Sequence, residues 1–125
     1  MRLVMLGMLM VGLMLGARPS IAQTACATEA GGVLTSTLTW TDADTVDPVG
    51  ILRGTTTGGP YTQIATAPAA SLTYTDPITA PATGSVSYYY VVNNQSAASG
   101  TSPNSNEGCK TFFAKPSAPA NLIVK

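Results

Sequence analysis

The segment VLTSTLTWT, residues 33–41, places apolar or small side chains at alternate positions and threonine between them. Leu34, Ser36, Leu38 and Trp40 share one face of an extended chain, and the threonines share the other. Successive side chains of a strand point to opposite faces of its sheet. The alternation therefore predicts a half-buried β-strand whose threonine face meets solvent.

Other segments repeat this period of two between polar turns. The strongest is VSYYYVVN, residues 86–93, in which Tyr88, Tyr90 and Val92 share one face. Shorter strands are expected at 49–53, 61–66, 71–75 and 107–113, the third of them ending before Asp76-Pro77, with a long polar loop at 94–106. No helical period interrupts this order, so the chain is predicted to be all-β, an antiparallel sandwich of about seven strands.

The first 22 residues are unlike the rest of the chain. All five methionines lie within residues 1–14, and an apolar run covers residues 3–17. That run is shorter than the roughly 20 residues that cross a membrane, and small residues precede a cleavage site after Ala22. We expect a signal peptide at 1–22 and a secreted or periplasmic protein with no membrane segment after cleavage.

The mature chain lacks the residues that many enzymes need. It carries four basic and six acidic side chains, a net charge of −2, and no histidine. Nucleic acid is therefore not an expected partner, and histidine-based triads and the usual zinc sites are excluded. A glycosidase with two carboxylates stays formally open, but a small sandwich offers little room for its cleft. We expect no enzyme activity, no cofactor and no metal.

Three acids, Asp42, Asp44 and Asp47, lie close together in one predicted loop. A calcium loop that began at Asp42 would have Val46 at a ligand position and Arg53 where glutamate is needed, so the template fails. These carboxylates are instead expected to stabilise a turn.

Two cysteines, Cys26 and Cys109, remain after cleavage. In an oxidising compartment they are expected to form one disulfide. Closing this loop would stabilise the fold by about 4 kcal/mol in the loop-entropy model. An alternative is that Cys26 is the lipid-modified first residue of a bacterial lipoprotein, although the usual leucine three positions upstream is missing.

Several motifs together resemble the fibronectin type III modules of secreted bacterial proteins. They are Leu38-Thr-Trp40, Ile51-Leu-Arg53-Gly54, Gly58-Gly59-Pro60-Tyr61, Leu72-Thr-Tyr74-Thr-Asp76, Tyr88-Tyr-Tyr90-Val-Val92 and Ser105-Asn-Glu107. The resemblance covers residues 33–113 and implies one immunoglobulin-like domain over 23–115. It also implies that a short first strand near residues 26–28 lies within reach of Cys109.

The resemblance and the strand phase assign residues to the two faces of the sandwich. Trp40 would be the core tryptophan of the second strand, and Tyr88 the tyrosine whose hydroxyl pins the preceding loop. The residues expected to mark the core are Leu38, Trp40, Ile51, Tyr74, Tyr88, Tyr90 and Val92.

An apolar patch is expected on the outer face of one sheet, at Leu52, Tyr89 and Val91. We expect this patch, or the loop at 94–106, to meet a protein partner, which would make the chain an interaction or spacer module. The alternative for these side chains is cross-strand packing on a solvated face. A second functional hypothesis is a carbohydrate-binding module, with Tyr61 and Tyr89 as the aromatic residues that would stack on a polysaccharide.

The last ten residues, PSAPANLIVK (116–125), resemble the opening strand of another such module. Leu122 and Val124 would face a core, and the prolines before them suit an edge strand. Three interpretations stay open: a linker and strand from a longer tandem protein, a strand that folds back on its own domain, and a strand donated to a neighbouring subunit.

Overall fold

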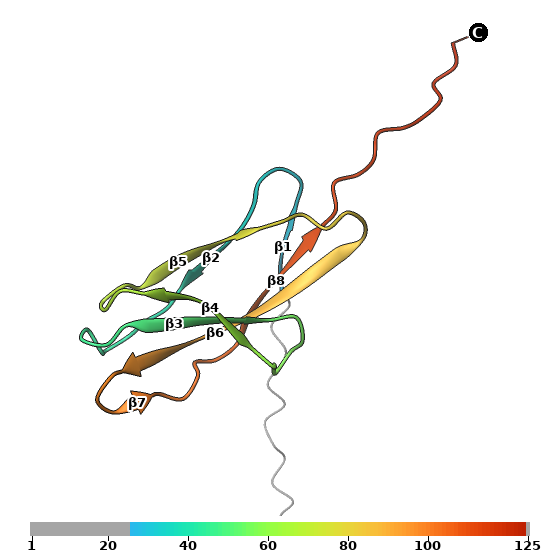
Figure 1. Ribbon diagram of the computed structural model, residues 1–125. Helices are drawn as coiled ribbons and strands as arrows, with labels where there is room; N and C mark the ends of the chain where they lie inside the picture. The colour runs from blue at the N-terminus through green and yellow to red at the C-terminus, as the bar shows by residue number, and fades with distance from the viewer. Residues whose placement is uncertain (1–25, 125) are drawn as a thin grey trace, which may run out of the picture.

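The computed structural model describes residues 26–124, which form two β-sheets packed face to face (Figure 1). The predicted signal peptide at 1–22 lies outside these residues. Among them, no helix is long and apolar enough to cross a membrane. The prediction of an all-β sandwich is confirmed. The strands are β1 (Ala27–Ala30), β2 (Leu34–Thr39), β3 (Val49–Gly54), β4 (Thr62–Ala67), β5 (Thr73–Ile78), β6 (Ser85–Ser96), β7 (Gly100–Thr101) and β8 (Gly108–Phe113).

The two sheets differ in size. The larger has the strand order β1-β8-β6-β3-β4, with the short β7 beside the end of β6, and the smaller consists of β2 and β5 alone. Neighbouring strands run antiparallel except β1 and β8, which run parallel. Because β1 joins β8, it does not extend the smaller sheet beside β2.

Apolar side chains fill the space between the sheets in two clusters. Leu34, Ile78 and Phe112 form the first, with Tyr88 packed against it. The second is built on Val49, Ile51 and Ala67 of the larger sheet. Four residues expected in the core pack against this second cluster and are partly buried: Leu38, Trp40, Tyr74 and Val92.

β5 is longer than predicted, because it continues through Asp76 and Pro77 to Ile78. Proline has no N–H to give to a sheet, so it is tolerated only where that group would face away from the neighbouring strand. β5 is an edge strand, and Pro77 lies opposite Thr35 in a register that sends its nitrogen outward. Asp76 was therefore wrongly predicted to end the strand.

β6 is also longer than predicted and takes in the first part of the expected loop at 94–106. It extends to Ser96, where it forms a hairpin with β7. Its polar end is held by hydrogen bonds, including the bond from the Gln95 backbone N–H to the Pro48 carbonyl at 2.9 Å. Hydrogen bonding by the backbone thus extends the strand beyond its apolar residues.

Candidate interaction surfaces

The patch predicted on the outer face does not offer all of its residues to a partner. Leu52 lies opposite Val91 on neighbouring strands, so both are on the outer face with Tyr89. Leu52 and Tyr89 are half-buried, but Val91 is only 4% exposed. The prediction that Val91 contributes to a partner surface is therefore wrong.

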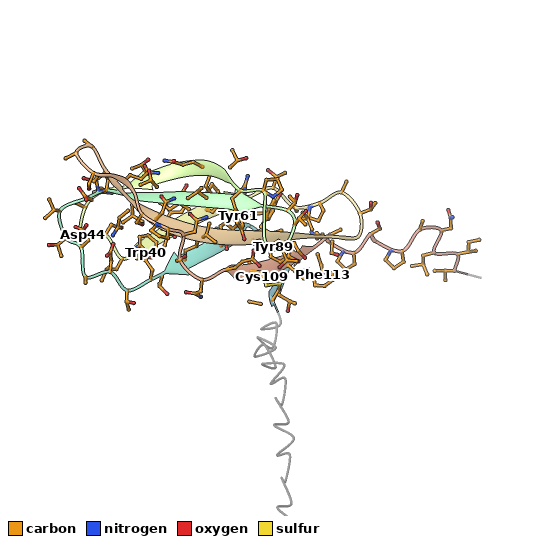
Figure 2. All side chains as sticks on the ribbon, turned by 90° about the horizontal axis from the view of Figure 1, so that it is seen from below. Trp40, Asp44, Tyr61, Tyr89, Cys109 and Phe113 are labelled. Atoms are coloured by element: carbon orange, nitrogen blue, oxygen red, sulfur yellow. A yellow bond between two sulfur atoms is a disulfide. The ribbon has the colours of Figure 1, made fainter. Side chains whose placement is uncertain are left out.

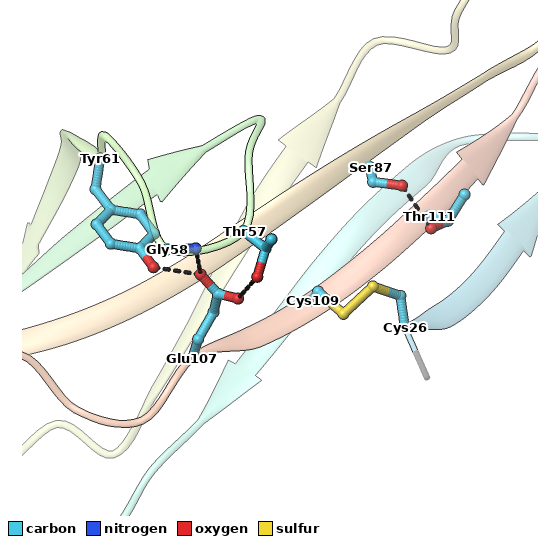
Figure 3. The surroundings of a disulfide bond; sticks show 8 residues. All are labelled: Cys26, Thr57, Gly58, Tyr61, Ser87, Glu107, Cys109 and Thr111. Carbon is cyan, nitrogen blue, oxygen red and sulfur yellow. Dashed lines mark hydrogen bonds between the residues drawn. A yellow bond between two sulfur atoms is a disulfide. The ribbon is translucent and has the colours of Figure 1, made fainter. Parts of the chain in front are cut away.

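A loop that crosses the outer face accounts for part of this burial. Residues 55–61 connect β3 to β4, yet Glu107, just before β8, accepts hydrogen bonds from the Thr57 hydroxyl and the Gly58 N–H, each at 2.8 Å. Tyr61 also donates its hydroxyl to Glu107 (Figure 3). Because β6 lies between β3 and β8 in the sheet, this loop must span β6.

The ring of Tyr61 lies against the sheet under this loop. A Cβ atom placed on Gly54 would be 2.6 Å from the Pro60 carbonyl oxygen and 3.2 Å from Cδ1 of Tyr61, so only glycine allows the loop to approach this closely. Gly54 lies opposite Tyr89. Tyr61 and Tyr89 therefore flank an occupied surface and do not form an open aromatic platform.

The carboxylate of Glu107 has an unusual environment for a surface acid. Burial alone would raise its pKa, but the hydrogen bonds from Tyr61, Gly58 and Thr57 outweigh burial and lower the pKa below its ordinary value. The pKa of the Tyr61 hydroxyl is raised, chiefly because it donates to this carboxylate. The loop is thus fastened most firmly when Glu107 is ionised and Tyr61 is protonated.

A buried acid that the sequence analysis placed in a turn connects the two sheets. Asp76 of β5 is 5% exposed, and its Oδ2 accepts hydrogen bonds from Nη1 of Arg53 at 2.7 Å and from the Tyr90 hydroxyl at 2.9 Å. Burial raises the pKa of Tyr90 strongly, so this hydroxyl keeps its proton. The sequence feature that could have indicated the burial of Asp76 is its alternation with Tyr74 and Ile78.

The hydroxyl bond that joins the two sheets comes from Tyr90, whereas the family resemblance assigned to Tyr88 a hydroxyl that pins the preceding loop. The ring of Tyr88 packs near Phe112, with 6.1 Å between centroids, and the Arg53 guanidinium lies 4.6 Å above it. Both tyrosines face inward, but Tyr90 lies level with Asp76. Tyr88 contributes its ring to the core, and its role as the hydroxyl that pins a loop stays a prediction.

The predicted disulfide between Cys26 and Cys109 is confirmed, with 4.8 Å between the two Cα atoms. It fastens the start of β1 to β8 (Figure 3). One residue further along β8, Lys110 forms an ion pair with Glu29 of β1 and donates to the Thr35 carbonyl at 2.8 Å. β1 is thereby held to β8 covalently and by charge.

The smaller sheet has an unpaired edge at β2. Among the strands of residues 26–124, β5 alone pairs with β2. Antiparallel partners alternate between pairs that exchange hydrogen bonds and pairs that do not. Thr35 lies opposite Pro77, which has no N–H, whereas the Trp40 N–H donates to the Leu72 carbonyl at 3.1 Å. Even-numbered residues of β2 therefore bond toward β5, and odd-numbered residues bond outward.

This alternation leaves three threonines with backbone groups on the free edge: Thr35, Thr37 and Thr39. At Thr35 both groups have partners, because the carbonyl accepts from Lys110 and the N–H donates to the Glu29 carboxylate. No strand among residues 26–124 lies beside the N–H and C=O groups of Thr37 and Thr39. An edge of this kind can pair with another extended chain.

A cleft of about 640 Å³ runs along the same part of β2. Residues 36–41 form one wall, and residues 90–92 of β6 with Ser105 and Gly108 contribute to the other. Trp40 lines the cleft, and its Nε1 is buried with no hydrogen-bond partner among the residues that the structure describes. Trp40 is therefore a half-buried residue beside an opening, where a fully enclosed core residue was expected.

The acidic loop before β3 is organised by its own backbone. Asp42 accepts from the Asp44 N–H at 2.9 Å, and Asp44 accepts from the N–H groups of Val46 and Asp47. These last two bonds lower the pKa of Asp44. Within residues 26–124, no three metal-ligating side chains of His, Cys, Asp or Glu form a group that could hold an ion.

Comparisons with known proteins identify a structural relative. No model of a known protein family matches the sequence, and no curated protein matches it. Among solved structures, the chain is similar to the crystal structure of a Fn3-like protein from Clostridium thermocellum, with 33% identity and a TM-score of 0.54. The match covers 75% of this chain and 90% of that one.

Proposed function

This chain belongs to the fibronectin type III-like family, and we propose that it is an exported, non-catalytic interaction module that binds an extended protein segment along the free edge of β2. The family fold supports a non-catalytic module in general terms. The disulfide is compatible with an extracellular location. Export, the kind of partner and the binding edge are the parts that we propose.

The observation that carries this proposal is that no strand of residues 26–124 lies beside the backbone groups of Thr37 and Thr39. An extended peptide that lies beside β2 would pair with them, and alternate side chains of the peptide would enter the neighbouring cleft. Backbone pairing supplies affinity with little dependence on sequence, and the cleft supplies selectivity. The predicted outer patch is a weaker site, because Val91 is buried and a loop spans β6 beside it.

The carbohydrate-binding alternative is less well supported. Stacking on a sugar needs an accessible aromatic face. Tyr61 instead gives its hydroxyl to Glu107 and lays its ring edge near Gly54. No other feature of the described residues favours a polysaccharide over a peptide.

A proline substitution can remove one outward backbone N–H from either edge of the smaller sheet, and this distinguishes the two edges. Thr37→Pro removes the outward N–H of β2 and leaves the bonds to β5 in place. Thr75 lies directly opposite Thr37, so Thr75→Pro removes the equivalent N–H from the far edge of the same sheet and is the matched control. Pro77 shows that β5 accepts proline at such a position.

The test selects binding peptides from a displayed library against the mature wild-type protein and then measures their affinity for the two variants. We expect Thr37→Pro to weaken binding by about tenfold or more, since a lost hydrogen bond is worth about 1 kcal/mol and an obstructing ring adds to this. Thr75→Pro should bind within about twofold of wild type. Peptides that bind Thr37→Pro with the same affinity as wild type would refute the proposed edge. So would peptides whose binding changes the surroundings of Leu52 and Tyr89 alone.

A further inference from the structure

The C-terminal segment of the chain has the properties of a strand without a sheet. Residues 114–124 have no regular secondary structure and extend away from the sandwich (Figure 1). Leu122, Ile123 and Val124 are 91%, 75% and 87% exposed. Three consecutive large apolar side chains in water, close to no other element of the described residues, indicate a segment that is buried in another state.

The free edge of β2 and this segment complement one another. The edge offers the backbone groups of two residues, Thr37 and Thr39, and the segment offers a short apolar run with no proline in it. We propose that residues 122–124 of one copy add as a strand to the β2 edge of a second copy, so that the chains assemble head to tail. This inference rests on the proposed function, since it names the occupant of the same edge.

The strand phase of β2 fixes which tail side chains would enter the cleft. Inward-facing residues of β2 have even numbers, as Ser36 and Leu38 show, and a residue placed level with them also points inward. Leu122 and Val124 together can occupy such positions, which turns Ile123 outward. In that register the two side chains lie beside Leu38 and Trp40, at the mouth of the cleft.

The arrangement of the domain favours a second copy over folding back. The tail begins at Ala114, whose N–H donates to the Gly84 carbonyl at 2.8 Å. At this end of the sandwich the β2 edge is closed, because Glu29 and Lys110 take the backbone groups of Thr35. The open part lies toward the other end, and Figure 2 shows Trp40 near the Asp44 loop and far from Phe113. The tail thus leaves the sandwich at the closed end and extends away from the open part of the edge (Figure 1), so it is presented to another molecule, as a head-to-tail interface requires.

Sedimentation velocity of the mature chain, with its disulfide intact, tests the inference over a range of concentrations. We expect the sedimentation coefficient to rise with concentration for wild type. Leu122→Ser with Val124→Ser should weaken association by about tenfold or more, because two side chains that enter the cleft become polar. Ile123→Ser is the matched control, and it should associate within about threefold of wild type because its side chain faces outward.

Mixing two defective variants tests the pairing itself. Thr37→Pro keeps a tail but lacks an acceptor edge, and the variant with both serines keeps the edge but lacks a donor. Each should stay monomeric alone, and together they should form a 1:1 complex that grows no further. If Thr37→Pro does not fold, a peptide of residues 114–125 titrated into the double-serine variant should change the fluorescence of Trp40, and the same peptide with both serines should not.

Several outcomes would overturn the inference. Wild type that stays monomeric at every concentration would exclude a second copy as the binding partner of the β2 edge. The proposed function would then be tested only by the affinities of the selected peptides. At concentrations where both variants are monomeric, a double-serine variant that is less stable than Ile123→Ser would show that the tail folds back on its own domain. Equal loss of association in the double-serine and Ile123→Ser variants would show unspecific apolar contact.

Discussion

Replacing Asp76 by alanine should destabilise the protein by about 3 kcal/mol. Asp76 is the shared acceptor of Arg53 and Tyr90, and its side chain is 7% exposed while that of Arg53 is 30% exposed. Removing one partner of a buried pair costs about 3 to 5 kcal/mol, because the remaining charge is left uncompensated. The lower end applies here, since the guanidinium reaches water and stays over the Tyr88 ring.

Urea unfolding with the disulfide intact measures this change. At about 4 to 8 °C per kcal/mol, the Tm should also fall by more than about 10 °C. Asp47→Asn, which removes an acid from the loop before β3, is the control and should change stability by less than about 0.5 kcal/mol. A double-mutant cycle with Arg53→Met should give a coupling of about 1 kcal/mol or more between Arg53 and Asp76. Loss of less than about 1 kcal/mol in Asp76→Ala would refute the view that this network joins the sheets.

Three further predictions follow from the same contacts. Replacing Cys26 and Cys109 by serine opens a loop with a sequence separation of 83 residues. The free energy of unfolding should fall by about 4 kcal/mol. A loss below about 1 kcal/mol, measured by urea unfolding, would contradict this prediction. The pKa of Glu107 is lowered in the folded protein, so its stabilising effect is complete above the unfolded pKa of about 4.3 and is lost as pH falls through the folded pKa. The Tm difference between wild type and Glu107→Gln should therefore shrink on acidification. A Tm difference that does not change with pH would count against the loop contact. Gly54→Ala should destabilise the protein by about 1 to 3 kcal/mol, and by more than Gly50→Ala. A Cβ added at Gly54 meets a backbone oxygen, whereas a Cβ added at Gly50 meets the movable ends of side chains. The reverse order of stability in thermal unfolding would refute this prediction.

The sequence predicted the architecture well because strand alternation is a local property. The period of two in residues 33–41 and 86–93 identified β2 and β6, and the cysteines identified the disulfide. Boundaries were less predictable where polar residues continue a strand. Asp76 and Pro77 carry turn signals in isolation, and only the position of β5 at an edge explains why they extend it.

The proposed interaction surface could not be predicted from the sequence because it depends on which strands are neighbours. Alternation correctly places Val91 on the outer face, but it does not show that a loop from β3 to β4 spans β6 and is held by Glu107. The free edge of β2 results from the pairing of β1 with β8, which no local pattern reveals. The sequence indicated the tail as an apolar strand, but it did not indicate the β2 edge to which we propose that this strand binds.

Amide hydrogen exchange, followed residue by residue, tests the free edge of β2 most directly. In dilute monomer the N–H groups of Thr37 and Thr39 should exchange at least about tenfold faster than those of Ser36 and Leu38, which bond to β5. On binding of a selected peptide or on self-association, Thr37 and Thr39 should become protected, with no change at Tyr89. Equal protection of all four β2 amides in the dilute monomer would show that the edge is already occupied and would contradict the account.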